Sequence, residues 1–124
     1  MANYFENKFV IYTFVRKDVL FMKFKKGVYI DAVVAKEILF DRFQLQQDKS
    51  VYVICDIDEI VGISLEARCL LQSIGPNLVV FVVYICSQIL PLSILNYFTN
   101  QPLNKLLHYI VSSFDEAMQI INKY

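Results

Sequence analysis

Three acidic residues follow a short apolar run, and they are the first candidates for chemistry in the sequence. Asp56, Asp58 and Glu59 come at the end of Val51–Ile57, which has the composition of a buried strand. Open α/β folds bind ligands beside the carboxyl ends of their strands, and carboxylate oxygens are ligands for Mg²⁺. No glycine-rich phosphate loop or nearby basic group completes such a site. We therefore favour a solvated acidic loop, and we expect no metal site and no cofactor.

The other potentially reactive side chains form no catalytic set. His108 is the only histidine, and no Cys, Ser or Asp motif lies beside it, so we expect a structural role. Cys55, Cys69 and Cys86 match no disulfide framework or zinc signature, because their number is odd and their spacing wide. Each lies in an apolar context, which is typical of a small buried hydrophobe in a reducing compartment. We predict no catalytic residues and a protein that is not an enzyme.

The bulk composition limits the classes of partner. The chain has 124 residues, which suits one domain spanning residues 1–124. Twelve Lys and Arg balance twelve Asp and Glu, so no net positive field recruits nucleic acid. The first residues, MANYFENKF, lack the basic and apolar regions of a secretory signal, and a cytoplasmic location is expected.

Alternating short strands and helices must position these residues. The two apolar runs Phe9–Phe14 and Val19–Phe24 predict a hairpin. The later elements are a helix at Asp31–Gln46, a strand at Val51–Ile57, a helix capped by Ser64, a strand at Leu78–Cys86, a helix at Gln88–Asn100, a strand at Leu107–Val111, and a last helix that begins with the capping box Ser113–Glu116. In the first of these helices we expect Asp31 to be the N-cap or a first-turn acid, and Val33 to be partly exposed. The predicted inner face of the last helix consists of Phe114, Ala117, Met118 and Ile121. The order β-β-α-β-α-β-α-β-α predicts an α/β fold with a mixed, largely parallel sheet and helices packed on it.

The run from Cys69 to Asn104 contains no charged residue or histidine and raises the question of a membrane span. Its most apolar part, Asn77–Phe98, is long enough to cross a bilayer. However, Ser87 and Gln88 divide it, its first half is β-branched, and its second half has helical spacing. We expect a strand buried on both faces followed by a helix, and no transmembrane segment.

The predicted helix Gln88–Asn100 is a candidate interface because its polar side has no charge. That side consists of Ser93, Asn96 and Asn100, with Leu92 beside them. Interface cores are depleted of charged residues, so we expect this helix to contact a second copy of the chain, another protein or a lipid-like ligand. The alternative is a weakly polar helix that faces water.

The element order and several segments give the chain a family resemblance. The hairpin, the segment ICDIDEIVGISLEARCLL, the apolar strand and the terminal FDEAMQIINKY resemble the sulfate transporter and anti-sigma factor antagonist (STAS) fold. More narrowly, the chain is similar to a group of small uncharacterised bacterial STAS-like proteins. The resemblance covers residues 9–124 and implies an anti-sigma antagonist-like architecture.

The resemblance also implies a place for a phosphorylated residue. Antagonists of this type carry Asp-Ser-Ser-Gly at a helix N-terminus, and a partner kinase phosphorylates the first Ser or Thr. Asp56 and Ile57 match the strand end of that pattern, and Ile63 matches the hydrophobic residue before the motif. Ser64–Ala67 (SLEA) then replaces the motif, with Leu65 at the phosphoacceptor position. The resemblance therefore implies that the phosphoacceptor is lost.

Asp56, Asp58, Glu59 and Ser64 together form a candidate regulatory loop. A phosphate on Ser64 would lie at a helix N-terminus, which favours it, but the neighbouring acids would repel it. We therefore expect Ser64 to be a structural N-cap.

From these observations we expect a non-enzymatic STAS-like regulatory or protein-interaction module that works by association, with itself as a homodimer or with another protein. The alternative is a small carrier of an apolar ligand or lipid.

Overall fold

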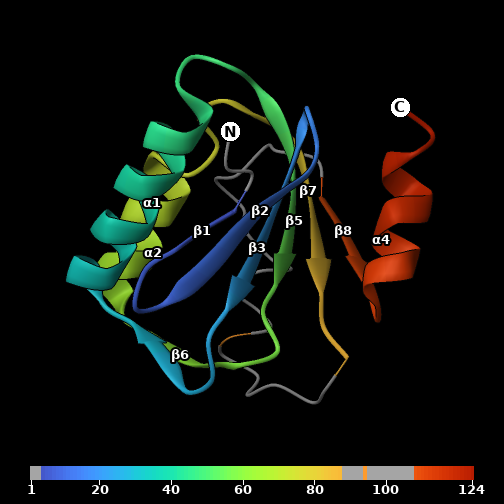
Figure 1. The fold of residues 1–124 in the computed structure, drawn as a ribbon. Helices are drawn as coiled ribbons and strands as arrows, with labels where there is room; N and C mark the ends of the chain where they lie inside the picture. Colours follow the sequence, from blue (N-terminus) through green and yellow to red (C-terminus); the bar gives the residue numbers. More distant parts are fainter. Residues whose placement is uncertain (1–3, 88–93, 95–107) are drawn as a thin grey trace.

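The computed structural model describes residues 4–87, 94 and 108–124, and a six-stranded mixed sheet forms its centre (Figure 1). The strands lie in the order β1-β2-β3-β5-β7-β8. They are β1 Tyr4–Glu6, β2 Val10–Arg16, β3 Val19–Phe24, β5 Val51–Asp56, β7 Val79–Ile85 and β8 His108–Val111. The first three strands pair antiparallel, and the pairs β3–β5, β5–β7 and β7–β8 are parallel.

The predicted N-terminal hairpin is confirmed as β2 and β3. Val10 pairs with Phe24 at its open end, and a bulge interrupts the register between Phe14 and Arg16. Beside the turn, the Arg16 guanidinium binds the Asp18 carboxylate, with Nε 2.8 Å from Oδ1. Parallel pairing begins at the next strand, as expected for strands joined by helical crossovers.

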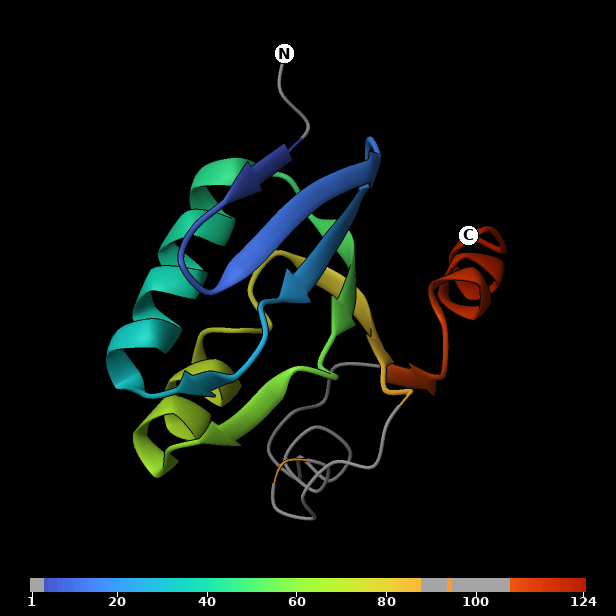
Figure 2. The same ribbon diagram turned by 60° about the horizontal axis from the view of Figure 1, so that its bottom comes forward.

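Helices cover both faces of the sheet, which confirms the predicted α/β class (Figures 1 and 2). The described helices are α1 Ala32–Gln46, α2 Leu65–Ser73 and α4 Phe114–Ile121. Successive strand residues point to opposite faces, so each strand contributes to two cores. On β5, Val53 and Cys55 join the core under α1 and α2. Between them, Ile54 joins the core under α4 with Ala117 and Ile121.

A separate two-stranded parallel sheet was not predicted. It pairs β4 (Val28–Ile30) with β6 (Ile60–Ile63), so that Ile30 lies opposite Ile63. With β1 it adds three short strands to the predicted order. Runs of three or four residues carry too little alternation to be recognised from hydrophobic periodicity.

The apolar run around β7 is an interior strand, as predicted. β7 lies between β5 and β8, and residues 81–85 are all buried. No helix within the described residues is long and apolar enough to span a membrane. The predicted helix Gln88–Asn100 lies outside the described residues, except for Ile94, which is buried in the core under α1 and α2.

Two polar residues are buried near the end of α1 and fix it to the rest of the fold. Arg42 is 3% exposed, and its guanidinium donates to the Gln46 side chain at 2.6 Å and to the carbonyl of Gly75 at 2.8 Å. Gln46, which is 1% exposed, donates to the carbonyls of Lys49 and Leu78 at 3.0 and 2.8 Å. Removal from water lowers the pKa of Arg42 to about 10.

The last helix begins with the predicted serine cap. The Ser113 hydroxyl accepts from the Glu116 N–H at 3.2 Å. The Glu116 carboxylate accepts from the Ser112 hydroxyl at 2.6 Å, whereas the predicted capping box assigned it the Ser113 N–H. The predicted inner face of this helix, Phe114, Ala117, Met118 and Ile121, is confirmed.

Candidate functional site

The β4–β6 pair brings the starts of α1 and α2 side by side. Ile30 and Ile63 pair at the ends of the two strands, and the next residues, Asp31 and Ser64, cap the two helices. The Ser64 N–H donates to the Ile30 carbonyl at 2.9 Å, which ties one start to the other. Two helices thus begin from one backbone frame.

Both predicted caps are confirmed by their hydrogen bonds. The Asp31 Oδ1 atom accepts from the Val34 N–H at 2.9 Å. The Ser64 Oγ atom accepts from the Ala67 N–H at 3.1 Å. Each cap satisfies an amide in the first turn that has no partner inside its helix. Ser64 therefore serves α2 in the structural role that the sequence predicts.

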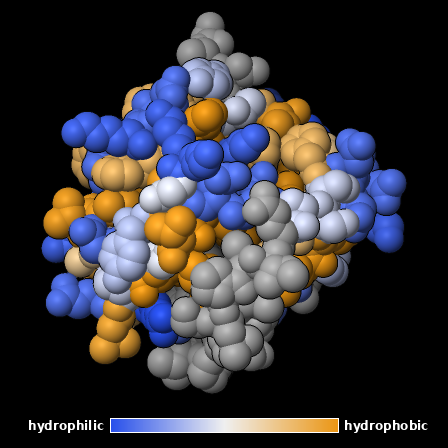
Figure 3. All heavy atoms as spheres, turned by 90° about the horizontal axis from the view of Figure 1, so that it is seen from below, coloured by the Kyte–Doolittle hydropathy of each residue, from blue (hydrophilic) through white to orange (hydrophobic). Residues whose placement is uncertain are grey.

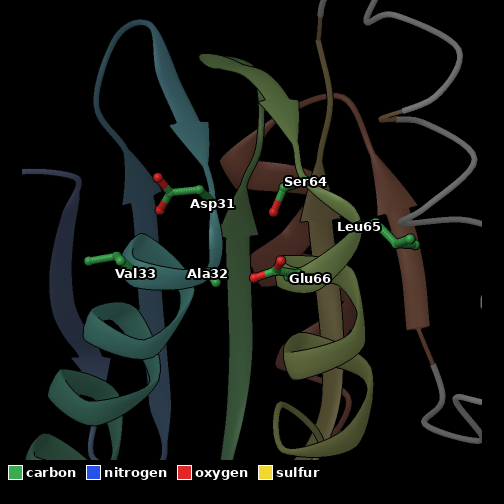
Figure 4. A pocket seen from close by; sticks show the side chains of 6 residues that line it. All are labelled: Asp31, Ala32, Val33, Ser64, Leu65 and Glu66. Carbon is green, nitrogen blue, oxygen red and sulfur yellow. The ribbon is translucent and has the colours of Figure 1, made fainter.

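A pocket open to solvent, of about 460 Å³, lies between the two helix starts (Figure 4). We call it the helix-start pocket, and its lining residues are Asp31, Ala32, Val33, Ser64, Leu65 and Glu66. In Figure 4 the Glu66 carboxylate and the Ser64 hydroxyl point into the space between the helices. Val33 and Leu65 point away to either side. The pocket thus has a polar centre and apolar flanks.

Exposed apolar side chains lie on this pocket and on the two strands that lead into it. Val33 is 71% exposed and Leu65 is 73% exposed. Tyr29 on β4 and Val61 on β6 are also more than half exposed. Hydrophobic residues reach the surface among hydrophilic ones on the lower face of the molecule (Figure 3). Contiguous exposed apolar groups mark interaction surfaces, whereas isolated ones are ordinary.

Tyr29 owes its position to Gly62, its partner in the β4–β6 ladder. A Cβ atom at Gly62 would lie 2.6 Å from Cδ2 and Cε2 of the Tyr29 ring. The missing side chain thus leaves room for the aromatic ring beside the strand. Any larger residue would move that ring.

The predicted acidic loop divides into two parts. Asp58 binds Ser87, two residues after β7, because its carboxylate accepts from the Ser87 N–H at 2.7 Å and from the Ser87 hydroxyl. Asp56 Oδ1 accepts from the Asp58 N–H at 3.1 Å. The Glu59 carbonyl accepts from the Gly27 N–H at 3.1 Å. None of these acids lines the helix-start pocket, where Ser64 lies.

Two acids of the loop accept hydrogen bonds from other residues of the chain. Burial is the main cause that raises the pKa of the Asp56 carboxyl above its usual value. Within residues 4–87, 94 and 108–124, no three metal-binding side chains converge on a possible ion position. Asp58 thus joins this loop to the segment that follows β7.

The single histidine and the cysteines lie apart from the pocket. His108 is half-buried on β8, with its ring centroid 6.2 Å from that of Tyr84. Cys55 is buried as predicted, and burial raises the pKa of its thiol. Cys69 contradicts the prediction of burial, because α2 presents it to solvent. Cys86 is partly buried.

The predicted interface helix is not among the residues that the structure describes. Leu92, Ser93, Asn96 and Asn100 all lie in residues 88–93 and 95–107. The homodimer contact predicted there stays a prediction.

The sequence prediction missed the helix-start pocket, although it found both caps and the exposure of Val33. What it lacked was the pairing of β4 with β6. Each strand is a short apolar run that ends directly before a capping residue: Val28–Ile30 before Asp31, and Ile60–Ile63 before Ser64. Two such runs, each followed by a helix, are the signal that indicates adjacent helix starts.

Comparisons with known proteins identify a family and a fold. Residues 13–124 match the family described as Domain of unknown function (DUF7793). The fold is similar to the crystal structure of an uncharacterized protein of the DUF3478 family, with a SpoIIAA-like fold, from Shewanella loihica PV-4. That match has a TM-score of 0.59 and 15% identity, and covers 97% of this chain and 98% of the other. It confirms the predicted STAS-like fold. No match was found among curated proteins.

Proposed function

Because the chain belongs to the DUF7793 family and has a SpoIIAA-like fold, we propose that it is a non-enzymatic regulatory module that works by protein association. The observation that carries the proposal is the side chain of Leu65. It stands where the STAS resemblance places a phosphoacceptor, and it is 73% exposed. A hydroxyl that a kinase switches is replaced there by an apolar group, which favours a permanent contact.

Residues 1–124 act as one cytoplasmic module whose association does not depend on phosphorylation at this position. The STAS-like fold is in general non-enzymatic, which supports a binding role. The fold alone assigns no activity, so the role is argued from the exposed surface. The partner is a second copy of the chain or another protein.

Light scattering coupled to size-exclusion chromatography tests the homodimer. At micromolar concentration we expect a mass twice the 14.5 kDa of the chain. Leu92→Lys and Asn96→Lys should then lower the mass toward that of the monomer, because a buried lysine at an apolar contact is costly. Gln44→Lys, on the exposed side of α1, is the matched control and should leave the mass unchanged. A wild-type monomer would rule out the homodimer and leave association with another protein.

Native mass spectrometry of freshly purified protein separates association from ligand transport. A carrier of an apolar ligand would retain a small molecule, whereas an association module gives the bare mass of the chain or its dimer. The carrier alternative depends on residues 88–93 and 95–107, which the structure does not describe. The described pocket does not favour it, since two of its six lining residues are acids.

A further inference from the structure

We infer that the helix-start pocket binds a partner-protein segment that carries one lysine or arginine side chain between apolar side chains. This inference rests on the proposed function, since it names the kind of partner that such a module takes. The flanks of the pocket, its charge and the position of its Glu66 carboxylate each favour this occupant.

The flanks of the pocket favour apolar contacts on two sides. Val33 belongs to α1 and Leu65 to α2, and they point away from the pocket in opposite directions (Figure 4). Both are aliphatic and mostly exposed, so a partner that covers them removes apolar surface from water. A segment that crosses both helix starts meets one apolar group before the polar centre and another after it.

The charge of the pocket favours a cation at its centre. Each helix N-terminus contributes roughly +0.5 of an elementary charge, and the carboxylates of Asp31 and Glu66 contribute one negative charge each. The sum is about −1, and no lysine or arginine lines the pocket. Within the described residues, neither the Arg16–Asp18 nor the Lys25–Glu6 ion pair includes a carboxylate of the pocket. A partner cation complements this charge and orients the segment.

The position of the Glu66 carboxylate disfavours an anion in the pocket. Helix N-termini bind anions through free amides, and the caps here engage one first-turn amide of each helix, that of Val34 and that of Ala67. One Asp31 oxygen is also engaged in that cap. The Glu66 carboxylate, in contrast, points into the space between the helices (Figure 4). A phosphate group or acidic peptide would have to approach this carboxylate and would be repelled.

A displayed library of random heptapeptides, selected on the immobilised full-length chain, tests the inference. We expect the enriched peptides to share a lysine or arginine with apolar residues on both sides. The strongest of them is then synthesised and titrated against the protein by fluorescence anisotropy. Its affinity should fall as salt is added, because screening weakens the pairing with Glu66.

Two variants in the pocket and two matched variants outside it locate the binding site. Leu65→Ser removes an apolar flank, and Glu66→Gln removes the central charge while keeping the shape of the side chain. Each should weaken peptide binding by about tenfold. The controls are Phe40→Ser and Glu37→Gln, which make the same kinds of change at exposed positions of α1 outside the pocket. They should bind the peptide like the wild type, and circular dichroism checks that all four fold.

Several results would overturn the inference, and they separate its failure from that of the proposed function. Selection of acidic or uncharged peptides, or of no peptide, removes the cationic partner. Peptide binding that is unaffected by Leu65→Ser and Glu66→Gln overturns the pocket but leaves association through another surface. A dimer that either of these two variants dissociates identifies the occupant as a second copy of the chain. The proposed function itself fails when light scattering shows a monomer and no peptide binds any surface.

Discussion

Helices α1 and α2 lie side by side, but the two ends of this pair are built in different ways. At their C-terminal ends, Arg42 and Gln46 are buried and donate to the carbonyls of the following loops. At their N-terminal ends, Leu65 and Glu66 face solvent around an open pocket. The two ends have polar and charged groups in common, and they differ in whether the protein itself satisfies those groups.

This difference separates stability from recognition. A buried donor whose partners are inside the protein contributes to folding, and its removal leaves acceptors without hydrogen bonds. An exposed carboxylate or aliphatic group contributes little to folding and is free to bind a partner. We therefore expect substitutions at the C-terminal end to change stability, and substitutions at the pocket to change binding.

The largest effect is expected at Arg42. Arg42→Met keeps much of the aliphatic volume but leaves the Gly75 carbonyl and the Gln46 side chain without their donor. The free energy of unfolding should fall by about 3 kcal/mol, measured by urea denaturation. Arg42→Lys should recover only part of this loss, because an ammonium group lacks the planar fork that reaches several acceptors. A loss below about 1 kcal/mol would show that the buried end contributes little more to stability than the pocket end does.

Gln46 is expected to have the next largest effect. Gln46→Ala removes the donor to the Lys49 and Leu78 carbonyls and the acceptor of the Arg42 guanidinium. We expect a loss of about 2 kcal/mol in the same assay. Because the two residues share a hydrogen bond, the double substitution with Arg42→Met should cost less than the sum of the single ones. Additive effects would mean that they do not act as one network.

Asp31 belongs to the pocket and also caps a helix, so its variants test the boundary between the two roles. Asp31→Ala removes the acceptor of the Val34 amide and should cost about 1 kcal/mol. Asp31→Asn keeps a capping oxygen and loses the charge, so thermal unfolding should show nearly wild-type stability. Equal losses in both variants would indicate that charge, and not capping, stabilises α1.

The smallest effect on stability is expected at Leu65. Leu65→Ser changes a side chain that is 73% exposed, so the free energy of unfolding should change by no more than about 0.5 kcal/mol. The same variant is expected to weaken peptide binding. Leu65→Ser should therefore change binding and not stability, whereas Arg42→Met should change stability. A clear loss of stability would mean that Leu65 packs against the fold.

Much of the fold could be predicted from the sequence, because its longer elements carry strong periodic patterns. Val19–Phe24 is a strand with the predicted bounds, and α1 begins and ends as expected after the cap Asp31. The caps at Ser64 and Ser113 were also recognised, because capping depends on a few neighbouring residues. Local signals of this kind survive in the folded protein.

The candidate site was harder to predict because it depends on contacts between distant segments. β4 and β6 are short, and their pairing joins residues that lie about thirty positions apart. The acids Asp56, Asp58 and Glu59 are recognisable in the sequence because they lie close together at the end of β5. Their sequence positions do not show that the Ser87 N–H donates to the Asp58 carboxylate. Conversely, Leu65 stood out only as a departure from the STAS motif, and its exposure followed from the fold.

The backbone bond between Ser64 and Ile30 has a consequence for how such proteins diversify. The helix starts are held by main-chain atoms and by the two capping oxygens, and none of these bonds involves the side chains of Val33, Leu65 or Glu66. Those three positions can therefore change identity at little cost to the scaffold beneath them. A gene copy could acquire a new binding preference through one or two substitutions, while the frame that displays them stays the same.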